Sequence, residues 1–178
     1  MKKYYRLLLL SLSFITLLFT FQSFNAHASH LKYLNKFPNE IKGTWYTYTN
    51  DSGLSKHKKI EKMVVNKKTF NFHPYRKHDV IEGANLTKKQ ENELNKTSRW
   101  SYAMEFNYKG HKWFNFMGWQ QGAGDGSFFN IHNFDGHKVL MSAGGAGISV
   151  DGQYYKSKTL AKKFSNKRFK GFNYYDNY

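Results

Sequence analysis

The chain has 178 residues, with 28 Lys and Arg against 12 Asp and Glu, so its formal charge is +16. It contains no cysteine, which excludes a disulfide scaffold, a thiolate zinc site, a cysteine nucleophile and a lipid-modified N-terminal cysteine. Aromatic residues make up 19% of the chain, which gives far more apolar surface than a disordered protein carries.

Residues 1–28 have the pattern of a secretory signal peptide. A basic head over residues 2–6 precedes an uncharged, mainly apolar run over 7–21, and Ala-His-Ala at 26–28 is a small-residue cleavage site. A retained anchor helix is the alternative, but this run is short for a bilayer span of about 20 residues. We therefore predict a secreted protein that is extracellular or associated with the cell wall, with a charge of +13 after cleavage.

We expect the rest of the chain to hold one domain, because its length matches a single domain of about 150 residues. Residues 29–42 are polar and are predicted to form a loosely attached leader, and the domain is expected over 43–178.

The first strand is predicted over 44–49, where every residue is aromatic or β-branched, and a turn follows at 50–53. Two more strands are expected over 59–66 and 69–73, joined as a hairpin at Lys67-Lys68.

An irregular stretch is expected over 74–85, because Pro74 has no N–H for a sheet ladder. Thr87 and Gln90 fit a capping box that would open a short helix over 90–95, and a solvated loop is the alternative.

The clearest strand is 100–108, in which five large apolar residues alternate with small or polar ones, a pattern that predicts one buried face. Residues 112–119 form its hairpin partner, and a glycine loop follows at 120–126.

A second hairpin is predicted over 127–134 and 137–142, because Asp135-Gly136 favours a two-residue turn. Another glycine loop at 144–147 precedes a short strand from 148, a helix over 155–164 and a final strand over 169–175. Together the elements predict a mainly β fold, an antiparallel barrel or sandwich of about eight strands with one helix on its C-terminal side.

Gly43-Thr44-Trp45 resembles the G-x-W motif of the lipocalin and calycin superfamily. The resemblance implies a lipocalin-like barrel in which Trp45 plugs one end, with Arg168 or Lys170 packed on its ring as a cation–π partner. It also implies a carrier of a small apolar ligand as one possible function.

The segments 38–48, 118–126 and 154–163 resemble a group of small exported proteins of lactic-acid bacteria without an assigned function. This resemblance implies a surface location and a common fold, and it transfers no catalytic or binding residue.

The chain shows no convincing catalytic set. Ser127, His132 and Asp135 lie on one strand and its turn, so their side chains are not expected to converge as a triad. Glu105 would be a buried acid if its face lined a cavity, but an exposed position is the expectation and no partner acid is evident. We therefore predict a non-enzymatic protein.

No cofactor or metal is predicted either. The histidine pairs 73/78 and 132/137 lack a metal-ligand spacing, so surface histidines are expected. The loop 122–126 has neither the lysine of a phosphate loop nor the spaced acids of a calcium loop.

The aromatic side chains allow two interpretations, a ligand pocket or a core filled by side chains, and filling is the default. The residues concerned are Trp45, Trp100, Tyr102, Met104, Phe106, Phe114 and Phe116.

The charge is concentrated near the C-terminus, where 156–170 contains seven basic residues and no acid. A second basic block holds Lys56, Lys58 and Lys59. These blocks predict attraction to anionic cell-wall polymers such as teichoic acids, or to a membrane surface, with mere solubility as the alternative and no specific nucleic acid as partner. We expect a monomer whose polyanion-binding residues are Lys156, Lys158, Lys162, Lys163, Lys167, Arg168 and Lys170.

Overall fold

A computed structural model describes residues 29–50 and 57–175. The predicted signal peptide, most of the predicted turn at 50–53 and Lys56 lie outside these residues. Within the described part, none of the helices has the length and apolar character needed to cross a membrane.

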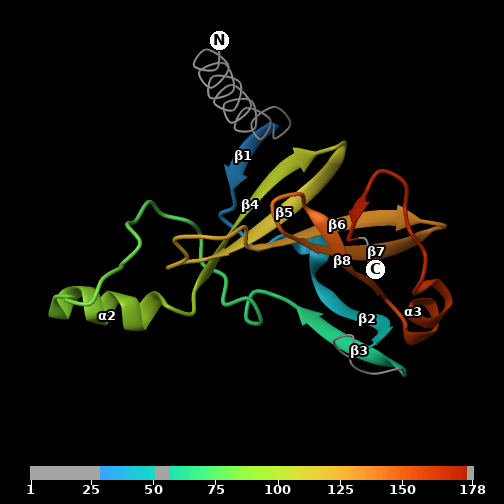
Figure 1. The fold of residues 1–178 in the computed structure, drawn as a ribbon, viewed down its shortest axis with the longest axis horizontal. Helices are drawn as coiled ribbons and strands as arrows, with labels where there is room; N and C mark the ends of the chain where they lie inside the picture. Colours follow the sequence, from blue (N-terminus) through green and yellow to red (C-terminus); the bar gives the residue numbers. More distant parts are fainter. Residues whose placement is uncertain (1–28, 51–56, 176–178) are drawn as a thin grey trace, which may run out of the picture.

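The strands form one nine-stranded sheet in the order β1-β4-β5-β6-β7-β8-β2-β3, with β9 beside β8 (Figure 1). The strand pairs are antiparallel except β8–β9, which confirms the mainly β, antiparallel prediction. The path is open and is not closed into a barrel. The strands are β1 (Ser29–Tyr33), β2 (Gly43–Asn50), β3 (Lys58–Val65), β4 (Ser101–Tyr108), β5 (His111–Gly118), β6 (Ser127–Phe134), β7 (His137–Gly144), β8 (Ser149–Tyr155) and β9 (Asn173–Tyr174).

Both faces of the sheet carry a hydrophobic core. Neighbouring residues on a strand point to opposite faces, and Trp113 and Phe114 accordingly belong to different clusters. This arrangement corrects the expectation that β4 buries one face only. Ala103, on the supposedly polar side, is fully buried, whereas Tyr102 and Met104 are half-buried.

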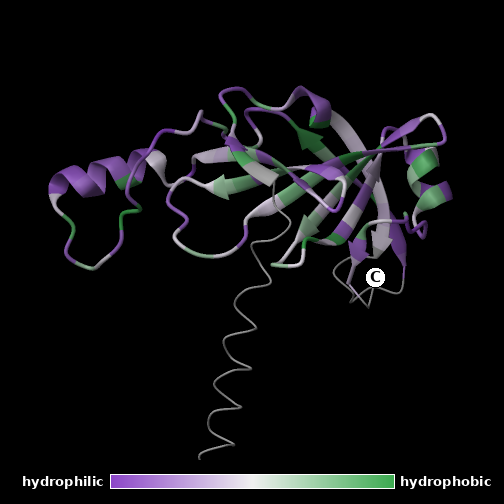
Figure 2. Cartoon of the chain, turned by 90° about the horizontal axis from the view of Figure 1, so that it is seen from above, coloured by the Kyte–Doolittle hydropathy of each residue, from purple (hydrophilic) through white to green (hydrophobic). Residues whose placement is uncertain are grey.

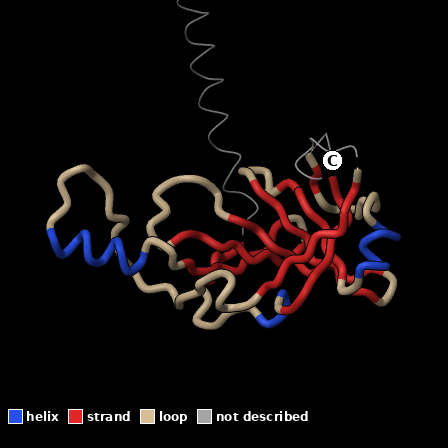
Figure 3. The backbone as a smooth tube through the Cα atoms, turned by 90° about the horizontal axis from the view of Figure 1, so that it is seen from below, coloured by secondary structure: helices blue, strands red, loops and turns tan. Residues whose placement is uncertain are grey.

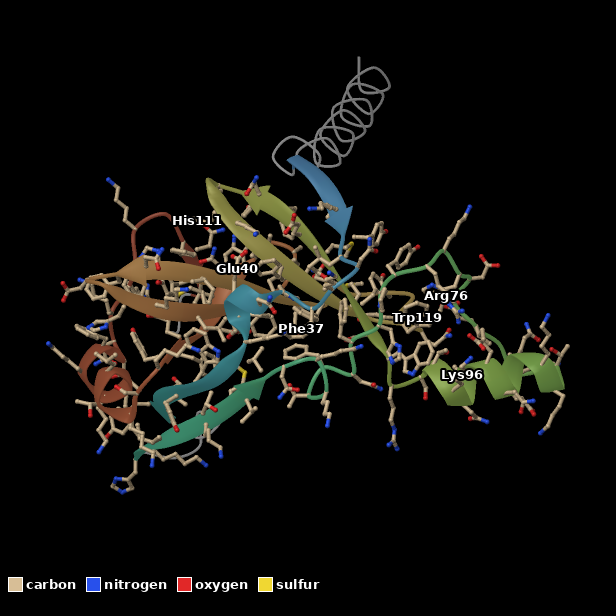
Figure 4. The ribbon with its side chains drawn as sticks, turned by 180° about the vertical axis from the view of Figure 1, so that it is seen from behind. Phe37, Glu40, Arg76, Lys96, His111 and Trp119 are labelled. Carbon is tan, nitrogen blue, oxygen red and sulfur yellow. The ribbon has the colours of Figure 1, made fainter. Side chains whose placement is uncertain are left out.

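The segment 29–42 is an integral part of the fold and not a loose leader. β1 pairs with β4, and the 3₁₀ helix η1 (Asn39–Ile41) follows it. Phe37, labelled in Figure 4, is 6% exposed, and Ile41 is fully buried. Both belong to the core cluster that contains Trp45. Strand pairing and these buried side chains together anchor the segment to the sheet.

The predicted hairpin at Lys67-Lys68 is wrong, because the turn over residues 66–71 is not followed, in the described part of the chain, by a strand that pairs with β3. The Asn66 Oδ1 atom accepts hydrogen bonds from the backbone N–H groups of Lys68 (2.7 Å) and Thr69 (3.0 Å). The predicted strand 69–73 is reduced to a single parallel bridge between Phe72 and Ser101.

The capping box at Thr87 and Gln90 is confirmed, and it begins the helix α2 (Lys88–Thr97). Figures 1 and 2 show α2 at the end of an arm that projects from the sheet, with a hydrophilic surface along its length.

The Asp135-Gly136 hairpin is also confirmed, with both residues at positive φ (49° and 71°), as a type I′ turn requires. The predicted helix from Tyr155 begins later, because β8 continues to Tyr155 and Ser157 caps α3 (Lys158–Phe164). The final strand is shorter than predicted, since only β9 pairs within 169–175.

Candidate polyanion-binding face

The helix α3 lies against β2, β3 and β8 and turns its basic residues outward. Its apolar residues Leu160, Ala161 and Phe164 pack against the core beneath it. The helix lies at the opposite end of the sheet from α2 (Figure 3). Because the apolar side faces the sheet, Lys158, Lys162 and Lys163 are exposed.

Lys158 and Lys162 are placed over two tyrosines of β2. Their ammonium nitrogens lie 6.0 Å from the ring centroids of Tyr46 and Tyr48 respectively. Tyr46 and Tyr48 share one side of the strand because they are two residues apart. A cation over an aromatic ring at this distance is weakly attracted to it, so the rings help to position the two lysines.

The strand β3 adds two further lysines to the same face. In the β2–β3 register, Lys62 is opposite Tyr46 and Lys58 is opposite Asn50. The Lys58 ammonium donates a 2.6 Å hydrogen bond to the side-chain oxygen of Asn166, just beyond the end of α3. The structure thus brings together two basic blocks about 100 residues apart in the chain. We call Lys58, Lys62, Lys158 and Lys162 the basic face.

Glu61, the one acid within β2 and β3, points away from the basic face. Glu61 lies between Lys62 and Ile60 in sequence, so it projects from the other side of β3, where it is 3.6 Å from the Lys59 ammonium. Among the described residues, no lysine of the basic face forms a salt bridge. Their positive charge is therefore not cancelled by described carboxylates.

The other predicted polyanion-binding residues spread outward from this face. Lys163 lies over Phe164, Lys167 over Phe134 and Arg168 over Tyr174, at 5.0, 5.1 and 5.2 Å from the ring centroids. Lys170 is exposed. These residues extend the positive region but do not converge on Tyr46 and Tyr48.

Lys156 has a different role from the rest of its block. Its ammonium lies 3.3 Å from the centroid of the Trp45 ring and donates a 3.1 Å hydrogen bond to the Lys42 carbonyl. The expectation that Arg168 or Lys170 covers Trp45 is therefore wrong. Burial, with Lys138 nearby, lowers the pKa of Lys156. Gly43 has φ +124°, which residues with side chains rarely adopt and glycine tolerates, and a Cβ there would lie 2.7 Å from the same ammonium and displace it.

The residues predicted to form a pocket or core mostly fill space. Trp45, Phe106, Phe114 and Phe116 are buried, and the core also contains Trp113, which the sequence reasoning missed. A pocket beside Trp113 has a volume of about 10 Å³, room for a single water. It is lined by Tyr108, Lys109, His111, Trp113, Ile148, Gly171, Phe172 and Asn173.

Trp100 and Tyr102 belong to a separate aromatic cluster at the base of the α2 arm. Trp119 is 1% exposed and forms its centre, with the His78 ring stacked on it at 4.4 Å. Arg76 lies over Trp119, and both are labelled near α2 in Figure 4. Lys96, at the end of α2, lies over Trp100. The cluster anchors the arm to the sheet. His78 lies within it, as does His73, which stacks on Trp100 at 3.6 Å.

Glu105 belongs to an ion-pair network and is not an isolated buried acid. Its carboxylate lies 2.9 Å from the Lys32 ammonium and 3.5 Å from that of Lys112. The hydrogen bond from Lys32 is the main cause of its lowered pKa, and Lys112 contributes. Among residues 29–50 and 57–175, no three His, Cys, Asp or Glu side chains are grouped as metal ligands.

His132, one member of the supposed triad, packs against the C-terminal segment. The centroid of its ring lies 4.5 Å from that of Phe169, 5.3 Å from that of Phe172 and 6.5 Å from that of His111. Ser127 and Asp135 are exposed at opposite ends of β6. Burial, with His111 nearby, lowers the pKa of His132.

This pKa shift predicts loss of stability in acid. The unfolded chain takes up the His132 proton near its usual pKa of about 6.5, before the folded protein does. The stability is therefore fully present above that pH and is lost as the pH falls through the folded pKa. We expect the urea midpoint to fall between pH 7.5 and 5, and to fall less in His132→Phe. The control His137→Gln, at an exposed histidine, should behave as wild type. An undiminished acid loss in His132→Phe would contradict the assignment.

No protein-family model, curated protein or solved structure matches the chain.

Proposed function

We propose that the protein is secreted, is not an enzyme, and binds anionic polymers of the bacterial cell wall or surface through the basic face. The observation that carries this proposal is the convergence of Lys58 with the α3 lysines through the 2.6 Å bond to Asn166. The signal-peptide pattern of residues 1–28 supports export, and the charge of +16 supports attraction to polyanions.

The physical basis of the binding is cooperative electrostatics. Lys158 and Lys162 are one helical turn apart, about 6 Å, which is within the Debye length of about 8 Å at physiological salt. Neighbouring lysines therefore act on a polymer together. Binding of a charged polymer releases counterions, so the affinity should fall steeply with added salt.

A carrier of a small apolar ligand receives less support. Most of the aromatic side chains that could have lined a pocket lie in the cores, and the 10 Å³ pocket beside Trp113 is far below the size of known ligand sites, about 300 Å³ or more. We nevertheless propose that this open sheet is related to the lipocalin-like fold. The support for this relationship is the cation over the G-x-W tryptophan, here supplied by Lys156.

The proposal is tested by sedimenting the purified protein with cell walls across a salt series, with and without prior removal of teichoic acid. We expect the bound fraction to fall as salt rises and to fall again when teichoic acid is removed. Retention that is insensitive to salt, or no retention at low salt, would refute electrostatic wall binding.

A further inference from the structure

Two lysines of the basic face, both on α3, lie over two tyrosines of β2 that are two residues apart. Lys158 and Lys162 are four residues apart on α3, which corresponds to about 6 Å along the helix. The tyrosines beneath them, Tyr46 and Tyr48, are two residues apart, which corresponds to about 7 Å along the strand. The two step lengths are similar, so each lysine reaches the next tyrosine.

Lys58 places a third ammonium at the next step of the same row. Asn166 follows Lys162 by four residues, and its side-chain oxygen holds the Lys58 ammonium at 2.6 Å. Lys58 is opposite Asn50, which follows Tyr48 by two residues on β2. The β2–β3 register thus assigns Lys58 to the third position, and the bond to Asn166 holds its ammonium just beyond the end of α3. Lys62, opposite Tyr46, adds a cation beside the first position.

We propose that this row binds a linear phosphodiester polymer with six backbone bonds between successive phosphates. This inference rests on the proposed polyanion binding and specifies its ligand. An extended peptide residue has three backbone bonds and spans about 3.3–3.6 Å. Six backbone bonds of an extended polymer therefore span about 7 Å. Successive phosphates would therefore meet successive lysines, which bind phosphate as point charges. Chains of glycerol phosphate and single-stranded nucleic acid share this spacing.

The surroundings of the row favour a polymer chain over a flat membrane. Membrane-surface helices insert apolar side chains beside their cations. The apolar residues of α3 point into the core instead. The described residues have four exposed large apolar side chains, and only Val64 borders the basic face. Among the described residues beside the row, the one large exposed apolar side chain is Val64, which is too little apolar surface to anchor a helix in a membrane.

The test compares labelled glycerol-phosphate oligomers and oligo(dT) of equal phosphate number, bound to the purified protein at several salt concentrations. Inorganic polyphosphate of the same phosphate number and vesicles of phosphatidylglycerol are the competitors. The double variant Lys158→Gln/Lys162→Gln removes two of the three positive charges of the row. Lys67→Gln/Lys68→Gln removes the same charge from an exposed turn at the other end of β3.

We expect both oligomers to bind with affinities within a few-fold of each other and to bind better than polyphosphate, whose charges are only two bonds apart. The Lys158/Lys162 variant should lose about tenfold in affinity or more, and its salt slope should fall by about two, one per lysine. The Lys67/Lys68 variant should stay within twofold of wild type.

Three results would overturn the proposal: equal losses in both double variants, tighter binding of polyphosphate, or stronger competition by the vesicles at equal phosphate. With equal losses the wall binding itself would stand, as a property of net charge. If neither oligomer nor cell walls bind at low salt, the proposed function fails as well.

Discussion

Replacing Trp45 with alanine is expected to lower the free energy of unfolding by about 3–5 kcal/mol, the range for a buried tryptophan. The Trp45 side chain is fully buried, and its indole N–H donates a 2.8 Å hydrogen bond to the Ile41 carbonyl. The substitution would leave a cavity, would remove the donor to the Ile41 carbonyl, and would remove the ring beneath the Lys156 ammonium. Urea unfolding of the purified protein, followed by circular dichroism, measures the change.

Two milder variants separate the contributions at this site and remain informative if Trp45→Ala does not fold. Trp45→Phe keeps an aromatic face but loses the N–H donor, and it should cost about 1–3 kcal/mol. Lys156→Met keeps the length of the side chain and removes the cation, and it should cost about 1 kcal/mol, the scale of a cation–π contact. A loss in Lys156→Met as large as that in Trp45→Ala would show that the ammonium, and not the buried ring, dominates.

Local sequence signals were sufficient for elements whose stabilising interactions are local. The Asp135-Gly136 turn needs only two residues at positive φ, and the helix α2 needs only the reciprocal bonds between Thr87 and Gln90. For these elements the prediction and the structure agree. The start of α3 was misplaced because Tyr155 suits either a strand or a helix. Its place in β8 is determined by pairing with Val139, which is distant in sequence.

Features that depend on distant contacts were not predicted. The leader was assigned from its polar composition, although burial of Phe37 and Ile41 depends on strands elsewhere in the chain. The partner of Trp45 was expected on the last strand, but β8 ends beside Trp45 and delivers Lys156. The basic face itself combines two blocks that only the β2–β3 pairing and the packing of α3 bring together. The sequence identified the basic residues, but it could not show which of them converge.

Reversing the charge of the basic face is expected to weaken binding to anionic polymers strongly without unfolding the protein. Each lysine near an anionic surface contributes about 1 kcal/mol, so loss of four should weaken binding at least about 100-fold. Exposed substitutions usually change stability by no more than about 0.5 kcal/mol each. The variant carries glutamate at positions 58, 62, 158 and 162, all of which hold exposed lysines.

A matched variant decides whether position or total charge matters. Glutamate at positions 67, 68, 88 and 89 removes four exposed lysines from the turn after β3 and from the start of α2, with the same change in net charge. We expect it to keep most of its affinity, because charges more than a Debye length from the polymer are screened at physiological salt. Sedimentation with cell walls, with the urea midpoint as a check of folding, compares the two variants with wild type. If both variants lost binding equally, the net charge would be responsible and the basic face would have no special role. A selective loss in the first variant would mean that the packing of α3 on β2 and β3 forms the binding site.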